Sequence, residues 1–424
     1  MTTEDRMTID ERRKYLRRMK KRYVCADRAE RSRLLDEMEV FTGMHRKSLI
    51  RLMHGSLERK PRRKQRGRTY GLAVDDALRI IAESLDYICA DRLAPNLVWL
   101  ATHLSAHGEL EVSPSLLERL GRISVSTVKR RLKHQRRDRP RLPRKGPTRA
   151  NQVQRDIPMK RIPWDVDEPG HFEVDLVHHC GDSASGEYAS TLQMIDIATG
   201  WSERVAVLGR SYLVMKDAFR RILARLPFPV REIHPDNGSE FLNHHMVRFW
   251  GELVQGLILS RSRPYQKNDN RHVEQKNATL VRAYLGHERL DSVAQVLAMN
   301  QLYDQMWLYY NLFQPVMRLT DKTVTFQQDK PTRVKRVYDQ ARTPFDRLCN
   351  TDAISHQCRQ QLETVREQTN PRRLRQEIYD WIDHIFSLAG AVPGITEDVF
   401  QTLAFPFSEK GDDEENGSPL DTNT

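Results

Sequence analysis

The sequence of 424 residues contains no run of about 18 apolar residues, so it predicts no transmembrane helix. Its first stretch, residues 1–14, is polar and charged and lacks the apolar segment of a signal peptide. We therefore expect a cytoplasmic protein with no membrane partner. The 5 cysteines are widely scattered and none forms a CxxC pair, so we expect neither a disulfide framework nor a cysteine-rich zinc site.

Acidic residues are scarce in the first part of the chain. Residues 1–150 hold 37 lysines and arginines against 19 aspartates and glutamates, a net charge of +18 within a whole-chain value of +12. The remainder carries −6. A basic front part joined to a near-neutral rear part predicts a module that binds a polyanion. Nucleic acid fits this imbalance best, although charge alone does not exclude an anionic membrane.

A chain of this length is too long for one ordinary core and predicts roughly two to four domains. The linker 58–71 could follow a DNA backbone or be a solvated linker, and the sequence favours neither. Composition and periodicity divide the chain into a helix-turn-helix module (1–57), a basic linker (58–71), a second helix-turn-helix module (72–135), a basic proline-rich linker (136–164), an α/β region (165–290), a C-terminal region (291–407) and an acidic, disordered tail (408–424).

The first module shows two short helices within residues 30–54, separated at Thr42 and Gly43. Each helix has an apolar stripe at helical spacing: Leu34, Leu35, Met38 and Phe41 in one, and Leu49, Ile50 and Met53 in the other. This pattern is typical of a helix-turn-helix whose second helix enters a major groove, although any small helical bundle contains such hairpins. The predicted DNA-binding residues are Arg46, Lys47 and Arg51.

The second module repeats this pattern within residues 116–133. Three leucines face a core, Gly121 turns the chain, and Ser124 or Ser126 can cap the next helix. Val128 and Leu132 would anchor that helix. Its predicted DNA-binding residues are Lys129, Arg130, Arg131 and Lys133.

From His171 onward the pattern changes to strands of period two. The order β-β-β-α-β-α-β-α predicts a mixed α/β sheet between two mostly helical regions. Residues 320–340 predict a small β element inside the C-terminal region.

Three carboxylates stand out by position. Asp175 lies inside an apolar strand, Asp236 directly follows a short strand, and Glu274 lies near the start of a helix. A lone aspartate in an apolar strand is unfavourable unless it is paired or binds a cation. Each residue has a structural alternative: Asp175 could pair with an arginine, Asp236 could cap a turn, and Glu274 could be a first-turn glutamate favoured by the helix dipole.

The motifs around these acids resemble a known family. The strand aspartate is followed by DNGSEF and then by PYQKNDNRHVEQKN, with 37 residues between Asp236 and Glu274. The segments YYNLFQP and TPFDRL extend the likeness. Together they resemble DDE-type bacterial insertion-sequence transposases, whose integrase catalytic core is like that of retroviral integrases. No His-His-Cys-Cys zinc module of the retroviral kind precedes this core.

The resemblance implies a ribonuclease H-like fold with Asp175, Asp236 and Glu274 as catalytic and metal-binding residues. It also implies two Mg²⁺ ions per site, with Mn²⁺ as an alternative, because two ions activate a nucleophile and stabilise a leaving oxygen. The partners would be double-stranded DNA at transposon ends and target. The expected activity is strand cleavage and strand transfer, that is, DNA integration and recombination.

Further roles follow from the same resemblance. Asn237 and Gly238 would shape the turn that presents Asp236. Lys267 and Asn268 lie in the loop where the family contacts the DNA end. Lys276 and Arg282 are candidate phosphate contacts by their charge, with solvated helix charges as the alternative. His178, His179 and Cys180 do not form a zinc site, because adjacent residues of a strand point to opposite faces.

Two other functions stay open. A ribonuclease H-type nuclease would share the acidic site without needing two helix-turn-helix modules, and a domesticated transposase would act as a DNA-binding regulator. One chain carries one site, so joining two DNA ends predicts a homodimer or larger oligomer on DNA. The aromatic segment 307–313 is nominated for packing between subunits or domains, with a core helix of the same chain as the alternative.

Overall fold

The computed structural model describes residues 7–58, 70–133, 166–235, 249–251, 257–260, 271–327 and 330–404. The chain divides into two compact units, Met1–Thr69 and Tyr70–Thr424. Residues 59–69 of the first predicted linker, the linker 136–164 and the tail 408–424 lie outside the described residues.

The first unit contains three helices, α1 (Ile9–Cys25), α2 (Arg28–Thr42) and α3 (Arg46–His54). Helix α2 ends at Gly43, whose φ of 64° is left-handed and therefore favours glycine. The predicted pair α2 and α3 is present, but the sequence prediction missed α1. It also placed Phe41 in the buried stripe, whereas this side chain is 57% exposed. The buried side chains come from all three helices and include Leu16, Met19, Leu34, Met38, Leu49 and Met53.

The second unit begins with a helical module. Its helices are α4 (Leu72–Ser84), α5 (Ala90–Leu93), η2 (Ala94–Asn96), α6 (Leu97–Ala106), α7 (Pro114–Arg122) and α8 (Val125–Leu132). Ser124 caps α8 by accepting a hydrogen bond from the Thr127 amide. The prediction that Gly121 turns the chain is wrong, because Gly121 lies inside α7 and the turn falls at Ile123 and Ser124.

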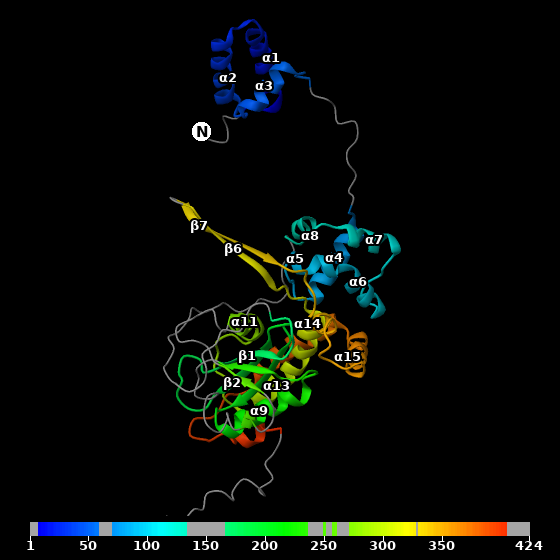
Figure 1. The fold of residues 1–424 in the computed structure, drawn as a ribbon, viewed down its shortest axis with the longest axis vertical. Coiled ribbons are helices and arrows are strands. Elements are labelled where there is room, and N and C mark those ends of the chain that lie inside the picture. Colours follow the sequence, from blue (N-terminus) through cyan, green and yellow to red (C-terminus); the bar gives the residue numbers. More distant parts are fainter. Residues whose placement is uncertain are drawn as a thin grey trace, which may run out of the picture. The chain divides into compact units, whose positions relative to one another are not determined.

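A five-stranded sheet follows, with the strand order β3-β2-β1-β4-β5. Its strands β1 and β2 are labelled in Figure 1. Strands β1, β2 and β3 are antiparallel neighbours, and β4 and β5 extend the sheet in parallel from β1. The elements are β1 (His171–His178), β2 (Ala189–Asp196), β3 (Ser202–Leu208), α9 (Tyr212–Arg225), β4 (Glu232–Pro235), β5 (Ile258–Leu259), α11 (Arg271–Lys276), η3 (Asn277–Arg282) and α12 (Ala283–Leu285).

The outer edge of β3 is covered by the next helices, α13 (Val293–Leu308) and the π-helical η4 (Tyr309–Phe313). The Asn300 side chain bonds the amide and carbonyl of Ala206, and the Asn311 side chain bonds those of Ser202. These bonds occupy backbone groups that an open sheet edge would offer to another chain.

Segment 307–313 belongs to this covering layer. Tyr309, Tyr310, Leu312 and Phe313 are buried within the same chain. The segment is therefore part of the core of its own chain, as the alternative predicted. The nominated packing between domains is also present, because the Tyr309 hydroxyl donates to the Ser84 carbonyl of the preceding helical module at 2.8 Å.

The C-terminal region contains a separate two-stranded sheet and four helices. Its elements are β6 (Leu319–Gln327), β7 (Lys330–Tyr338), α14 (Pro344–Leu348), α15 (His356–Gln368), α16 (Pro371–Ser387) and η5 (Val399–Thr402). The predicted fold class is confirmed: helical modules precede a mixed α/β core of the ribonuclease H-like kind, and a mostly helical region follows. Within the described residues no helix is long and apolar enough to cross a membrane.

Candidate active site

Asp175 lies on the central strand β1, where it is half-buried. Its carboxylate accepts a hydrogen bond of 2.6 Å from the Asn277 side chain and one of 2.8 Å from the Leu176 amide. Hydrogen bonds to a carboxylate favour its charged form. The structure thus holds an oxygen ligand at a fixed place on the sheet.

Helix α11 is held against this strand at two points. The amide of Val273 donates to the buried carboxylate of Glu173 at 2.9 Å, and Asn277 donates to Asp175. Glu274 lies between these two anchors in the sequence and is exposed. The buried side of this helical run consists of Val273, Leu280 and Tyr284, which are at most 4% exposed.

Strand β4 leads to the third predicted acid. It runs parallel to β1, and its last residue, Pro235, is the register partner of Val174. Asp175 follows Val174 in the sequence, and Asp236 follows Pro235. Asp236 itself, together with the predicted Asn237 and Gly238, lies outside the described residues.

The donor set suits magnesium, because Asp175 and Glu274 offer hard carboxylate oxygens. Among the described residues no three histidines, cysteines or acids gather around a common point. Two of the three predicted ligands, Asp175 and Glu274, lie on β1 and α11, which are held together by hydrogen bonds. The metal-binding roles of all three residues stay predictions.

The helix changes form where it meets Asp175. The segment Asn277–Arg282 is π-helical and follows α11 without a break. Such segments often occur at functional sites. The change of helical form therefore coincides with the Asn277–Asp175 hydrogen bond.

Two cations on this helix point into the protein. Arg282, weighed as a phosphate contact, donates instead to the carbonyls of Gly286 and His178. Burial, with Arg92 and Arg204 nearby, lowers the pKa of Lys276 to about 7. Lys276 therefore differs from the solvated lysine expected of a DNA contact. Lys267 and Asn268 lie outside the described residues.

The predicted DNA-binding residues of the two helical modules fall into two groups. Arg46 pairs with Asp36 and bonds Ser32, and Arg131 pairs with Asp75. These two arginines are held by their own modules. The others are exposed on α3 and α8 or directly after it: Lys47, Arg51, Lys129, Arg130 and Lys133.

His179 lies inside the protein, away from solvent. Its Nε2 is 2.8 Å from the hydroxyl of Thr191, which is itself 2.5 Å from the hydroxyl of Tyr303. Burial lowers the pKa of His179 to about 3, so the ring is neutral at ordinary pH. It is a core residue.

Sequence reasoning missed Asp86, which connects the helical module of the second unit to the helix of Glu274. Its buried carboxylate accepts hydrogen bonds from the hydroxyls of Tyr284 and Tyr379, at 2.9 and 3.1 Å, and is 3.4 Å from the guanidinium of Arg375. Tyr284 continues the same helical run as Glu274. Both Asp86 and Tyr87 have left-handed backbones, with φ of 52° and 55°.

No family model matches the sequence. The uncharacterized protein y4rM of Sinorhizobium fredii is 37% identical over 303 residues, which cover 71% of this chain and 86% of that protein.

Three solved structures are similar at low identity. They are the BIV integrase catalytic core (17% identity, 26% of this chain and 66% of that chain, TM-score 0.21), the simian T-cell lymphotropic virus intasome (16%, 42% and 57%, 0.24) and the HTLV-2 integrase catalytic core in complex with magnesium (17%, 35% and 90%, 0.26). The matched part spans less than two thirds of the first two chains. The stronger likeness is to the bacterial relative, and on its identity and coverage this chain belongs to the same family as y4rM of Sinorhizobium fredii.

Proposed function

We propose that the protein is a DDE-type transposase, which cleaves DNA strands at the ends of a mobile element and joins them to target DNA. One observation carries the proposal. Strand β1 holds Asp175 beside the helix of Glu274, and β4 ends at the register partner of Val174, one residue before Asp236. The DNGSEF and KNDNRHVEQKN motifs lie at the matching positions in the sequence.

In this proposal Asp175, Asp236 and Glu274 hold two divalent ions through carboxylate oxygens. The ions supply activation of the attacking oxygen and stabilisation of the leaving oxygen. The protein's own contribution is position: Asn277 fixes the Asp175 carboxylate, and Glu173 fixes the first turn of α11. Water first breaks a phosphodiester to free a 3′-hydroxyl, which then displaces a strand of the target. Each step exchanges one phosphorus–oxygen bond for another.

The exposed cations of α3 and α8 support DNA binding by the two helical modules. Because each chain carries one such site, joining two ends requires at least two chains. We therefore propose a dimer or larger assembly on DNA.

Single substitutions test the site. Asp175→Asn, Asp236→Asn and Glu274→Gln should each lower strand cleavage and joining by at least about a thousandfold with Mg²⁺ or Mn²⁺, since each removes a metal ligand. DNA binding should stay within about twofold of the unchanged protein.

Glu288→Gln is the matched control, because Glu288 is an exposed glutamate shortly after α12. It should keep full activity. Near-normal cleavage by any one of the three variants would refute the assignment. Cleavage of RNA–DNA hybrids in place of element ends would favour a ribonuclease H-type nuclease.

A further inference from the structure

Strands β6 and β7 form a two-stranded ribbon that belongs to neither face nor edge of the main sheet (Figure 1). The ribbon pairs antiparallel from Leu319–Tyr338 to Gln327–Lys330. An isolated two-stranded ribbon is only marginally stable in water. Its place in the protein therefore needs an explanation.

The ribbon is basic. Residues 319–338 contain five lysines and arginines and two aspartates, a net charge of +3. Lys322 is the register partner of Arg336, and two threonines are the partners of Arg333 and Lys335. Basic residues therefore outnumber acidic ones along the ribbon, and this charge favours a polyanion as its partner.

Two of these cations are exposed and adjacent. Lys335 and Arg336 are exposed, and successive residues of a strand point to opposite faces. The ribbon therefore presents positive charge on both faces. Val337 and Tyr338, next in the strand, are 39% and 48% exposed.

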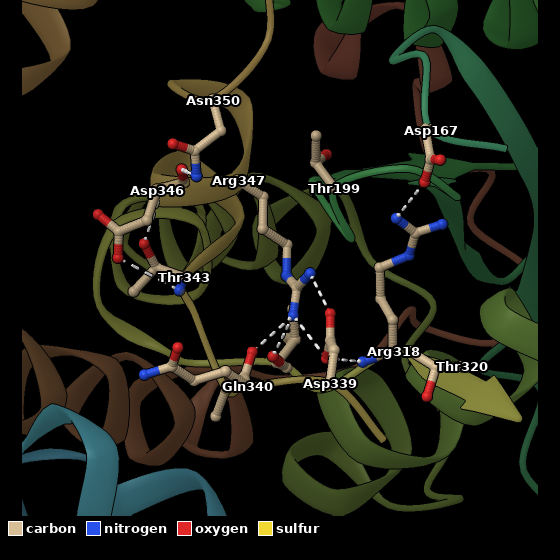
Figure 2. Close-up of polar contacts among 12 residues, drawn as sticks. Asp167, Thr199, Arg318, Thr320, Asp339, Gln340, Thr343, Asp346, Arg347 and Asn350 are labelled. Atoms are coloured by element: carbon tan, nitrogen blue, oxygen red, sulfur yellow. Dashed lines mark hydrogen bonds and ion pairs between the residues drawn. The ribbon is translucent and has the colours of Figure 1, made fainter. Parts of the chain in front are cut away.

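The base of the ribbon is fixed by a clamp of Arg318, Asp339 and Arg347 (Figure 2). The Arg347 guanidinium donates to both carboxylate oxygens of Asp339, at 2.6 and 3.0 Å, and to the Val316 carbonyl at 2.9 Å. The Arg318 amide donates to the same carboxylate at 2.7 Å. A forked arginine–carboxylate pair is strong and directional. The clamp thus joins the start of β6 and the end of β7 to α14.

We propose that the ribbon is a further DNA-binding element, which enters a groove of double-stranded DNA while the clamp fixes its direction. The inference rests on the proposed function. A major groove is wide enough for a two-stranded ribbon, and the phosphates of both strands flank whatever enters it. Cations on both faces suit that arrangement. Pairing of two ribbons from two copies of this chain is disfavoured, because each carries +3.

The test uses the full chain and a random-sequence duplex of about 40 base pairs without divalent metal, a length chosen to exceed one binding site. The double variant Lys335→Ala/Arg336→Ala is compared with Arg359→Ala/Arg373→Ala. The control removes two exposed cations from α15 and α16, so both proteins lose the same charge. Binding is measured by fluorescence anisotropy between 50 and 200 mM salt (about the range over which phosphate contacts show).

Each lost phosphate contact lowers the slope of log affinity against log salt by about 0.9. The ribbon variant should therefore show a slope smaller in magnitude by about 1.8. Over this fourfold rise in salt, the affinity of the unchanged protein should fall about twelvefold further than the affinity of the variant. The control should keep the slope of the unchanged protein.

Equal slopes in the two variants would overturn the ribbon proposal, and they would leave the proposed function intact if element ends are still cleaved. A reduced slope without cleavage under any divalent metal would support the ribbon proposal and refute the proposed transposase activity.

A second variant, Asp339→Ala, keeps every ribbon cation and breaks the clamp. It should weaken binding several-fold at an unchanged slope, since the phosphate contacts remain available. Unchanged affinity would refute the role of the clamp.

Discussion

The two helical modules have similar sequences in outline and different places in the structure. Both contain a pair of helices around a short turn. The first module, residues 1–57, carries a net charge of +6, whereas residues 72–135 hold eight basic and eight acidic residues, and their basic side chains gather at α8. The first, α1 to α3, has its own buried cluster and forms a unit by itself. The second, α4 to α8, shares one continuous core with the sheet and the C-terminal helices. A helix-turn-helix pattern therefore does not by itself show whether a module is independent.

Polar contacts explain how the second module is held. Arg92 donates to the Pro315 carbonyl at 2.5 Å, Asn96 to that of Ala341 at 3.2 Å, and His103 lies 2.9 Å from the Thr369 carbonyl. Arg372 of α16 pairs with Glu83 and Glu109 of the module. These contacts join it to the region that follows the core.

Asp86 connects the second module to the candidate active site. Through Tyr284 it is bonded to the helical run that carries Glu274, and Tyr284 in turn accepts a bond of 2.6 Å from Tyr310. The second module is thus connected to the candidate active site, whereas the first belongs to another unit.

The largest expected effect is on isolated fragments. Residues 1–69 should fold alone and melt cooperatively, because their core is complete. Residues 70–140 should lose a cooperative transition, because the faces of α4 and α6 against the C-terminal region become exposed. Circular dichroism and amide dispersion in NMR spectra measure this. A cooperative melt of 70–140 would contradict the comparison and show that the second module also folds independently.

A smaller effect separates two aspartates, one in each module. Asp86→Ala should destabilise the second unit by about 3 kcal/mol, since it deprives buried Arg375 of a carboxylate. Asp36→Ala, which removes a 64% exposed partner of Arg46, should cost less than about 1 kcal/mol. Denaturant unfolding of the full chain, followed separately for the two units, measures both. Equal costs would show that Asp86 has no special role.

The sequence predicted much of the fold because strands and helices here follow their apolar periods closely. The order of β1 to β4, the helix from Arg271 and the small β element were all predictable. Helix α1 was missed because its residues are mostly charged, with only Leu16, Met19 and Tyr23 buried. Short apolar stripes in charged helices are easily overlooked.

The sequence singled out the acids of the candidate site and not the residues that position them. Asp175 and Glu274 are recognisable from motif and spacing, whereas Glu173 and Asp86 gain their roles only from distant partners, Val273 and Tyr284. Nothing local distinguishes these two acids from surface residues. Lys276 illustrates the reverse case, since its charge suggested a DNA contact and its burial is a property of the fold.

The smallest expected effect concerns pH. His179 in the second unit is buried with a pKa of about 3, whereas His45 and His54 of the first module are exposed. An unfolded chain binds a proton at this position below about pH 6.5, and the folded chain does not, so protonation stabilises the unfolded state. The contribution of neutral His179 to the free energy of unfolding is complete above pH 6.5 and is lost as pH falls, by about 2 kcal/mol at pH 5.

His179→Gln cannot bind this proton, so its stability deficit relative to the unchanged protein should shrink between pH 7.5 and 5 by about that amount. Denaturant unfolding of both proteins at several pH values measures the difference, with unfolding of the first module as the internal control. A deficit that stays constant with pH would mean that His179 is charged or solvated in the folded protein.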